Sequence, residues 1–108
     1  MFVSIVIDPG SDSRAHELGD ILAQYGLKMA QQGVWESSSI ASATLDRVKN
    51  DLDKATAFYD KIRIYQFPID GAFVITTLTE KKWRRLVARG NLRKEAEIEN
   101  PGIVKRRS

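Results

Sequence analysis

The stretch that most constrains the fold is the apolar run at the N-terminus, residues 2–7, which ends at Asp8 and is followed by Pro9 and Gly10. A short apolar run rich in β-branched residues and closed by Pro-Gly is typical of a strand buried on both faces, at the centre of a sheet. Proline cannot continue the ladder, so Asp8 is expected where the core strand meets solvent. Its carboxylate either accepts hydrogen bonds from the turn or is a functional group.

Two segments have the periodicity of amphipathic helices. The first follows a cap at Ser11 or Ser13 and ends at Gly26, a residue that favours the left-handed conformation of a helix terminus. Its apolar face consists of Leu18, Ile21, Leu22 and Tyr25. The apolar face of the second consists of Ala41, Leu45, Val48, Leu52, Ala55 and Tyr59.

The remaining segments predict strands. Residues 27–36 are expected to be extended and bent at Gly33, residues 61–67 and 73–78 are expected to be strands, and residues 68–71 a turn. Thr79 is expected to cap a short helix over residues 80–88, with a strand through Leu86 and Val87 as the alternative.

This order predicts an α+β fold, a ferredoxin-like βαββαβ sandwich with an added C-terminal strand. Both helices would cover one face of an antiparallel sheet. The other face, with Met29, Trp35 or Tyr65 on it, would then need a cover, and a second copy of the chain, giving a homodimer, is the simplest one. Residues 1–90 form the domain, and residues 91–108 form a basic C-terminal extension that is either flexible or used in dimer pairing.

The charge is unevenly distributed along the chain. Residues 1–80 hold 7 Lys or Arg against 11 Asp or Glu, a net charge of −4, whereas residues 81–108 hold 10 against 3, a net charge of +7. Such asymmetry favours an anionic partner, most commonly nucleic acid. The chain has no cysteine, no apolar stretch long enough to cross a bilayer and no basic region ahead of its first apolar run. These features predict a cytoplasmic protein without membrane contact.

The motifs of phosphate-binding loops, nucleophile elbows and zincins are absent, and His16 is the single histidine. The remaining candidates are carboxylates, of which Asp8 is the best placed. A single carboxylate binds Mg²⁺ weakly. In a two-fold dimer, however, two Asp8 side chains near the axis could hold one metal ion per dimer, and a hydrated metal there could activate water for phosphodiester cleavage.

These residues resemble the CRISPR-associated protein 2 family, the small partner of the CRISPR adaptation integrase. The resemblance covers roughly residues 1–90 and rests on the order and spacing of short pieces. They are the first strand ending in Asp8, then Ser11, Asp12 and Arg14, then Tyr25-Gly26-Leu27, residues 31–36 (QQGVWE), Arg63-Ile64-Tyr65 and Thr79-Glu80-Lys81 running on to Gly90.

The resemblance implies a ferredoxin-like homodimer in which Asp8 is the catalytic and metal-binding residue, with one Mg²⁺ per dimer. It implies a Mg²⁺-dependent endonuclease or endoribonuclease acting on DNA or RNA, and a role in spacer acquisition as a partner of the integrase. The chain departs from the usual family pattern at Ile7, at Pro9-Gly10 and at Gly33.

Nucleic-acid phosphates are expected to bind the cationic side chains. These candidates are Arg14, Lys28, Arg63, Lys82, Arg84 and Arg85, the last three within the basic segment 81–94. Two alternatives stay open. One is a stand-alone toxin ribonuclease resembling virulence-associated protein D, and the other is a ferredoxin-like regulatory or RNA-binding domain, although the aromatic pattern of an RNA-recognition domain is absent.

Overall fold

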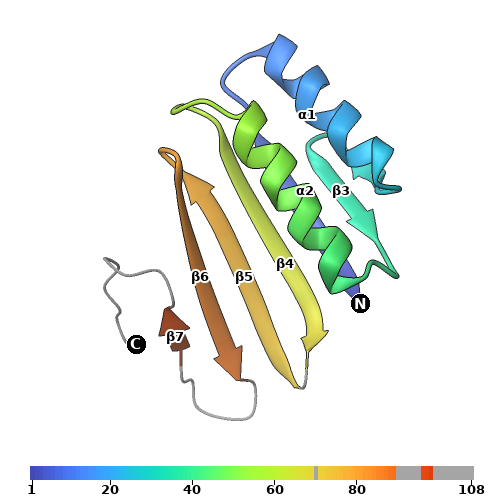
Figure 1. The fold of residues 1–108 in the computed structure, drawn as a ribbon, viewed down its shortest axis with the longest axis vertical. Coiled ribbons are helices and arrows are strands. Elements are labelled where there is room, and N and C mark those ends of the chain that lie inside the picture. Colours follow the sequence, from blue (N-terminus) through green and yellow to red (C-terminus); the bar gives the residue numbers. More distant parts are fainter. Residues whose placement is uncertain (70, 90–95, 99–108) are drawn as a thin grey trace.

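The N-terminal strand lies at the centre of the sheet, as its composition predicts. The computed structural model describes residues 1–69, 71–89 and 96–98. Strand β1 (Phe2–Asp8) pairs with β3 (Val34–Ser37) on one side and with β4 (Lys61–Ile69) on the other, antiparallel to both (Figure 1).

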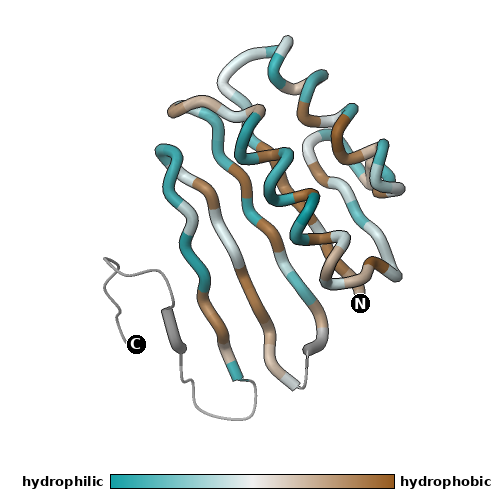
Figure 2. Tube along the Cα trace, viewed as in Figure 1, coloured by the Kyte–Doolittle hydropathy of each residue, from teal (hydrophilic) through white to brown (hydrophobic). Residues whose placement is uncertain are grey.

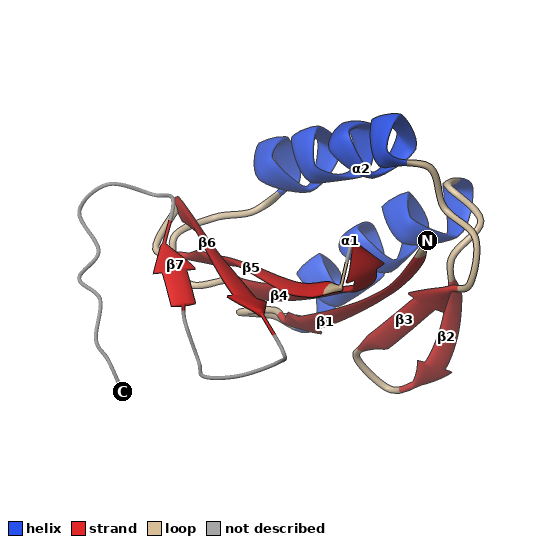
Figure 3. Ribbon diagram, turned by 90° about the horizontal axis from the view of Figure 1, so that it is seen from below, coloured by secondary structure: helices blue, strands red, loops and turns tan. Residues whose placement is uncertain are grey.

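Only one face of β1 is fully buried, so the prediction of burial on both faces is wrong for the single chain. Val3 and Ile5 are 0% exposed and Ile7 is buried, whereas Ser4 and Val6 between them are partly exposed. The reason is that both helices lie on the same side of the sheet (Figure 3). The opposite side, which we call the open face, has no described helix over it.

The described residues form a sheet of seven strands in the order β2-β3-β1-β4-β5-β6-β7, in which all neighbouring pairs are antiparallel. The other four strands are β2 (Lys28–Gln31), β5 (Ala72–Thr79), β6 (Lys82–Arg89) and β7 (Ala96–Ile98). Strand β4 runs two residues beyond the predicted 61–67, which shortens the predicted turn at 68–71. Together with the two helices that the structure describes, this sheet gives an α+β fold, as predicted.

Helix α1 (Asp12–Gln24) begins and ends at the predicted signals. The Ser11 hydroxyl accepts a hydrogen bond from the Arg14 amide at 3.2 Å, which caps the first turn. Gly26 follows the helix with φ of 88°. The left-handed turn there and the bend at Gly33, with φ of 81°, are both conformations that glycine adopts without steric cost.

Helix α2 (Ser42–Ala55) ends earlier than the apolar periodicity predicts, so Tyr59 does not lie on it. Thr56 leaves the helical conformation, and its hydroxyl donates to the carbonyl oxygen of Leu52 at 2.9 Å. Lys81 lies in the turn after β5, and its side-chain ammonium donates hydrogen bonds to the carbonyl oxygens of Asp53 and Thr56. A cation at the C-terminus of a helix satisfies its unpaired carbonyls and its negative dipole end.

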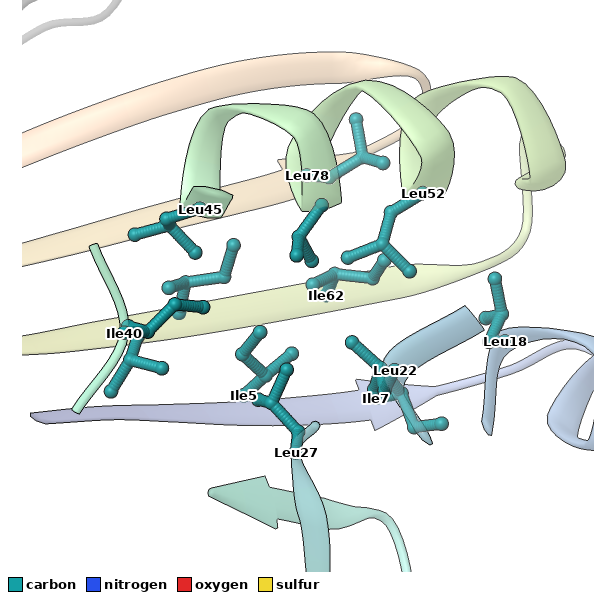
Figure 4. Close-up of a cluster of buried hydrophobic side chains, with 13 residues drawn as sticks. Ile5, Ile7, Leu18, Leu22, Leu27, Ile40, Leu45, Leu52, Ile62 and Leu78 are labelled. Carbon is teal, nitrogen blue, oxygen red and sulfur yellow. The ribbon is translucent and has the colours of Figure 1, made fainter. Parts of the chain in front are cut away.

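The core lies between the two helices and the sheet (Figure 4). Leucines of the helices, such as Leu22 and Leu52, pack against Ile5, Ile62 and Leu78 of the central strands. Figure 2 shows the same division along the chain, with hydrophobic segments in the strands beneath α2 and hydrophilic residues at the turn between β5 and β6. None of the helices that the structure describes is long and apolar enough to cross a membrane.

The predicted helix over residues 80–88 is wrong, and the alternative strand is correct. Glu80 and Lys81 form a two-residue turn with φ of 55° and 61°, and β6 returns along β5 from Lys82 onward. Positive φ at both central residues is the type I′ geometry that suits a β-hairpin. The indole Nε1 of Trp83 donates to Asp53 Oδ1 at 2.9 Å, which ties the hairpin to the end of α2.

Of the predicted C-terminal extension 91–108, the structure describes residues 96–98, which pair with β6 of the same chain. The rest of this extension lies outside the described residues. Its predicted role in dimer pairing stays a prediction.

Candidate nucleic-acid and metal site

Asp8 is the last residue of the central strand, and its side chain is exposed. Side chains alternate along a strand, so Asp8 projects to the open face because Ile7 projects to the core. Its cross-strand partner is Lys61, the first residue of β4. Within the part of the chain that the structure describes, the Asp8 carboxylate makes no hydrogen bond or ion pair. It is therefore not the acceptor that organises the turn.

A different carboxylate organises that turn. Asp60, which is 2% exposed, accepts hydrogen bonds of 2.6 Å from the amides of Gly10 and Ala57. The Nε of Arg14 lies 3.0 Å from Asp60 Oδ2 in an ion pair, and Nη1 donates to the carbonyl oxygen of Ala55. We call these contacts the Asp60 clamp. The clamp fixes the loop after β1 to the loop after α2.

Gly10 belongs to the clamp because of its small size. A Cβ at position 10 would lie 3.3 Å from Asp60 Oδ1 and 3.3 Å from Tyr59 Cβ, so a larger residue would push the two loops apart. Gly10 thus has a structural role in the loop that follows Asp8.

Three of the predicted phosphate-binding residues lie on the open face along β4 and β6, of which β4 is the strand beside Asp8 and β6 is three strands from β1. Arg63 of β4 is the cross-strand partner of Val6 of β1. On its other side Arg63 pairs with Thr77 of β5, which in turn pairs with Arg84 of β6. Because adjacent strands are about 4.8 Å apart, the backbones at Arg63 and Arg84 are about 10 Å apart. Lys82 lies one pleat from Arg84 on the same face, towards the end of the sheet where β1 ends.

The other three predicted cations are placed differently. Arg14 is held in the Asp60 clamp and also pairs with Glu17 at 3.1 Å. Lys28 is exposed on β2, the far edge strand, opposite Glu36. Arg85 is on the helix-covered side of β6, next to the buried Thr76. The structure therefore does not bring these three together with Asp8, and their predicted role in binding stays a prediction.

The opposite end of the open face is aromatic. The Phe67 ring lies 4.5 Å from the Phe73 ring and 5.7 Å from the Phe2 ring, measured between centroids, and the Tyr65 ring is stacked 6.3 Å away. Arg63 joins the two ends, because its Nε donates to the Tyr65 hydroxyl at 2.8 Å. These four rings, together with Ile75 and Leu86 in register with Tyr65, form the open-face aromatic cluster.

Two residues predicted for the open face lie elsewhere. Trp35 packs against the core, and a Cβ at Gly19 of α1 would come within 3.0 Å of its ring. Met29 is opposite Trp35 and shares its side of the sheet. The prediction for Tyr65 is correct.

The described residues test whether one chain can hold a metal ion. No group of three or more His, Cys, Asp or Glu side chains among them is close enough to form a metal site. Asp8 is an exposed hard-oxygen ligand, which is the donor that Mg²⁺ prefers, but one carboxylate binds Mg²⁺ weakly unless waters or substrate phosphates complete the coordination. A second copy that supplied another Asp8 would strengthen the donor set.

Sequence reasoning did not single out Asp60, Phe58 or Tyr59. Asp60 has the same local signal as any acid in a polar loop, and its hydrogen-bond partner Gly10 is 50 residues away in the sequence. The adjacent Phe58 and Tyr59 were detectable as an aromatic pair before a strand, but the apolar periodicity assigned Tyr59 to the helix. His16 is exposed on α1.

Comparison with the models of known protein families gave no match to this chain, and comparison with curated proteins gave none either.

Proposed function

We propose that this chain is a CRISPR adaptation protein similar to the CRISPR-associated protein 2 family: a ferredoxin-like homodimer that binds nucleic acid and partners the adaptation integrase. The observation that carries the proposal is the position of Asp8, an exposed carboxylate at the end of the central strand, on the same face as Arg63 and Arg84. The order β2-β3-β1-β4 is the one that a βαββαβ ferredoxin-like unit requires.

The homodimer is supported by the open-face aromatic cluster. Phe73 is 36% exposed in the single chain, and the neighbouring rings are half-buried. Contiguous apolar surface of this kind, bordered by charged residues, is typical of an interaction site. A two-fold contact between two such faces would cover both clusters and place the two Asp8 residues on the inner side of the dimer.

In this proposal the chain's own residues bind and position the nucleic acid. Arg63, Arg84 and Lys82 bind phosphates, and the clamp holds the loop beside Asp8 in place. The two Asp8 carboxylates would hold Mg²⁺, which when bound supplies charge neutralisation and an activated water for phosphodiester hydrolysis. The arginine near Tyr65 is partly ordered already, so less side-chain entropy is lost when it meets a phosphate.

The salt dependence of binding tests the phosphate contacts. Each phosphate contact adds about 0.7 to 0.9 to the slope of log affinity against log salt concentration. Arg63→Ala and Arg84→Ala should each lower the slope by about that amount, measured by fluorescence anisotropy with labelled DNA and RNA. Arg47→Ala, an exposed arginine of α2 on the covered side, is the matched control and should leave the slope unchanged. An affinity that is indifferent to salt would refute the phosphate-binding proposal.

Cleavage is tested at Asp8. Asp8→Ala should abolish any Mg²⁺-dependent cleavage while the protein stays folded and dimeric. Cleavage that survives this substitution would refute the role of Asp8. The gene neighbourhood and a pull-down with the integrase separate the adaptation role from that of a toxin ribonuclease, which should instead arrest growth without an integrase partner.

A further inference from the structure

Two aromatic side chains stand out in solvent close to Asp8. Phe58 is 51% exposed and Tyr59 is 78% exposed, in the loop between α2 and β4. Their rings meet edge to face, with centroids 5.3 Å apart and planes at 83°. Burying an aromatic ring is strongly favourable, so two adjacent rings left in water suggest a surface that a ligand covers.

The loop that carries the two rings is firmly held. The next residue, Asp60, is buried in the Asp60 clamp and bonded to the Ala57 and Gly10 amides. The Asp60 amide in turn donates to the carbonyl of Ala57 at 3.1 Å. The rings are therefore displayed by a fixed backbone, which lowers the entropy lost when a ligand stacks on them.

The pair lies at the same end of the sheet as Asp8. Tyr59 Cβ would touch a Cβ at Gly10, two residues after Asp8. Lys61, two residues after Tyr59, is the cross-strand partner of Asp8. In Figure 1 the end of α2 and the start of β4 lie at one end of the domain, and the pairing of Asp8 with Lys61 places the end of β1 there too.

We infer that Phe58 and Tyr59 form a stacking platform for an unpaired nucleobase, so that the proposed nucleic-acid ligand has a single-stranded segment at the Asp8 end. The inference rests on the proposed function and adds the class of nucleic acid to it. Aromatic side chains stack any base, whereas the bases inside a duplex are already stacked on each other. RNA and DNA share this chemistry.

The surroundings of the pair favour a nucleobase over a protein partner. The core of a protein interface is depleted of charged residues. Here exposed Lys54 lies four residues before Phe58, and exposed Lys61 lies two residues after Tyr59. Tyr59 lies against Gly10, two residues after Asp8. The open-face aromatic cluster is at the opposite end of the sheet and is not continuous with it. A ligand with alternating flat rings and anionic groups matches this surface.

The test compares the affinity of the full chain for two kinds of probe. One is a labelled single-stranded adenylate oligomer, made as RNA and as DNA, and the other is a fully paired, blunt-ended duplex of the same length. Phe58→Ala/Tyr59→Ala should weaken binding of the single strand at least about fivefold. It should leave the duplex affinity and the salt slope unchanged.

Two control variants separate the effect of losing the aromatic rings from other effects of substitution. Met29→Ala removes another exposed apolar side chain, 57% exposed on the far edge strand, and should change nothing. Phe58→Tyr/Tyr59→Phe keeps both rings and should bind the single strand like the wild type. Photocrosslinking of the wild type to a single strand containing 5-iodouracil should map to Phe58 or Tyr59, and this readout does not depend on how the variants fold.

The outcomes separate the two proposals. If the wild type binds in a salt-dependent way and the double alanine variant binds single strands equally well, the platform is refuted and the phosphate-binding function stands. Equal weakening for single strand and duplex, or crosslinks that map only elsewhere, also refutes the platform. A wild type that binds no probe refutes both.

Discussion

The two faces of the sheet have opposite compositions although they are built from the same strands. On the covered face Ile5, Ile64 and Leu78 are 0% exposed beneath the helices. On the open face, Tyr65 and Ile75 pair with each other across β4 and β5, and both side chains stay partly exposed. The covered face supplies the stability of the fold, and the open face carries the exposed carboxylate, the arginines and the aromatic cluster. Alternate residues of the same strand therefore serve the stability of the fold on one face and the proposed function on the other.

The difference between the two faces is tested most clearly by truncating one isoleucine on each face. Ile64→Ala on the covered face should lower the free energy of unfolding by about 2–5 kcal/mol, because it leaves a cavity in a tightly packed core. Ile75→Ala on the open face should cost about 1 kcal/mol in dilute solution, since its side chain is only partly buried. Urea denaturation of both variants measures the difference.

Protein concentration sharpens that test. If a second copy covers the open face, the cost of Ile75→Ala should increase with protein concentration, because the substitution then also weakens association. The cost of Ile64→Ala should stay nearly constant. Equal costs for the two variants at all concentrations would contradict the division between the faces.

Two aspartates give a smaller contrast. Asp60→Asn should destabilise the fold by about 1–3 kcal/mol, because the amide cannot accept hydrogen bonds from both backbone N–H groups and removes the buried ionic partner of the Arg14 Nε. Asp8→Asn should change stability by less than about 0.5 kcal/mol, since its carboxylate is exposed. Thermal unfolding of the two variants compares them, and a large loss for Asp8→Asn would give that residue a structural role.

The smallest expected effect is on the covered side, where Tyr25 donates to Asp51 Oδ2 at 2.5 Å and joins the two helices. This hydrogen bond, with burial and the charge of Asp51, raises the pKa of Tyr25. A raised folded-state pKa gives stability that is full below the ordinary tyrosine pKa and is lost as pH rises through the folded-state value. Tyr25→Phe should therefore flatten the alkaline loss of stability, measured by urea unfolding at about pH 8 and about pH 11. An unchanged pH dependence would contradict this.

Much of the fold was predictable because local signals agreed with the tertiary packing. The Ser11 cap, the bend at Gly33 and the central position of β1 are each encoded within a few residues. The helix predicted over residues 80–88 failed because Trp83 and Val87 also fit the two-residue period of a strand, and pairing with β5 decided between the two.

The candidate site was less predictable because it depends on long-range contacts. Asp8 was identified from its place at the end of a strand. Asp60 was missed because its partner Gly10 is 50 residues away in the sequence. Tyr59 was assigned to the helix because the sequence does not reveal that Lys81, in the turn between β5 and β6, bonds to the carbonyls where α2 ends. Neither contact has a signature in the sequence around those residues.

The most direct test of the proposed symmetric dimer uses a cysteine placed at Asp8. The chain has no cysteine, so Asp8→Cys introduces a single thiol. Treated with a short bis-maleimide, this variant should form a covalent dimer rapidly, whereas Met29→Cys on the far edge strand should not. A wild type that is monomeric by sedimentation, or an Asp8→Cys variant that crosslinks no faster than Met29→Cys, would contradict the account.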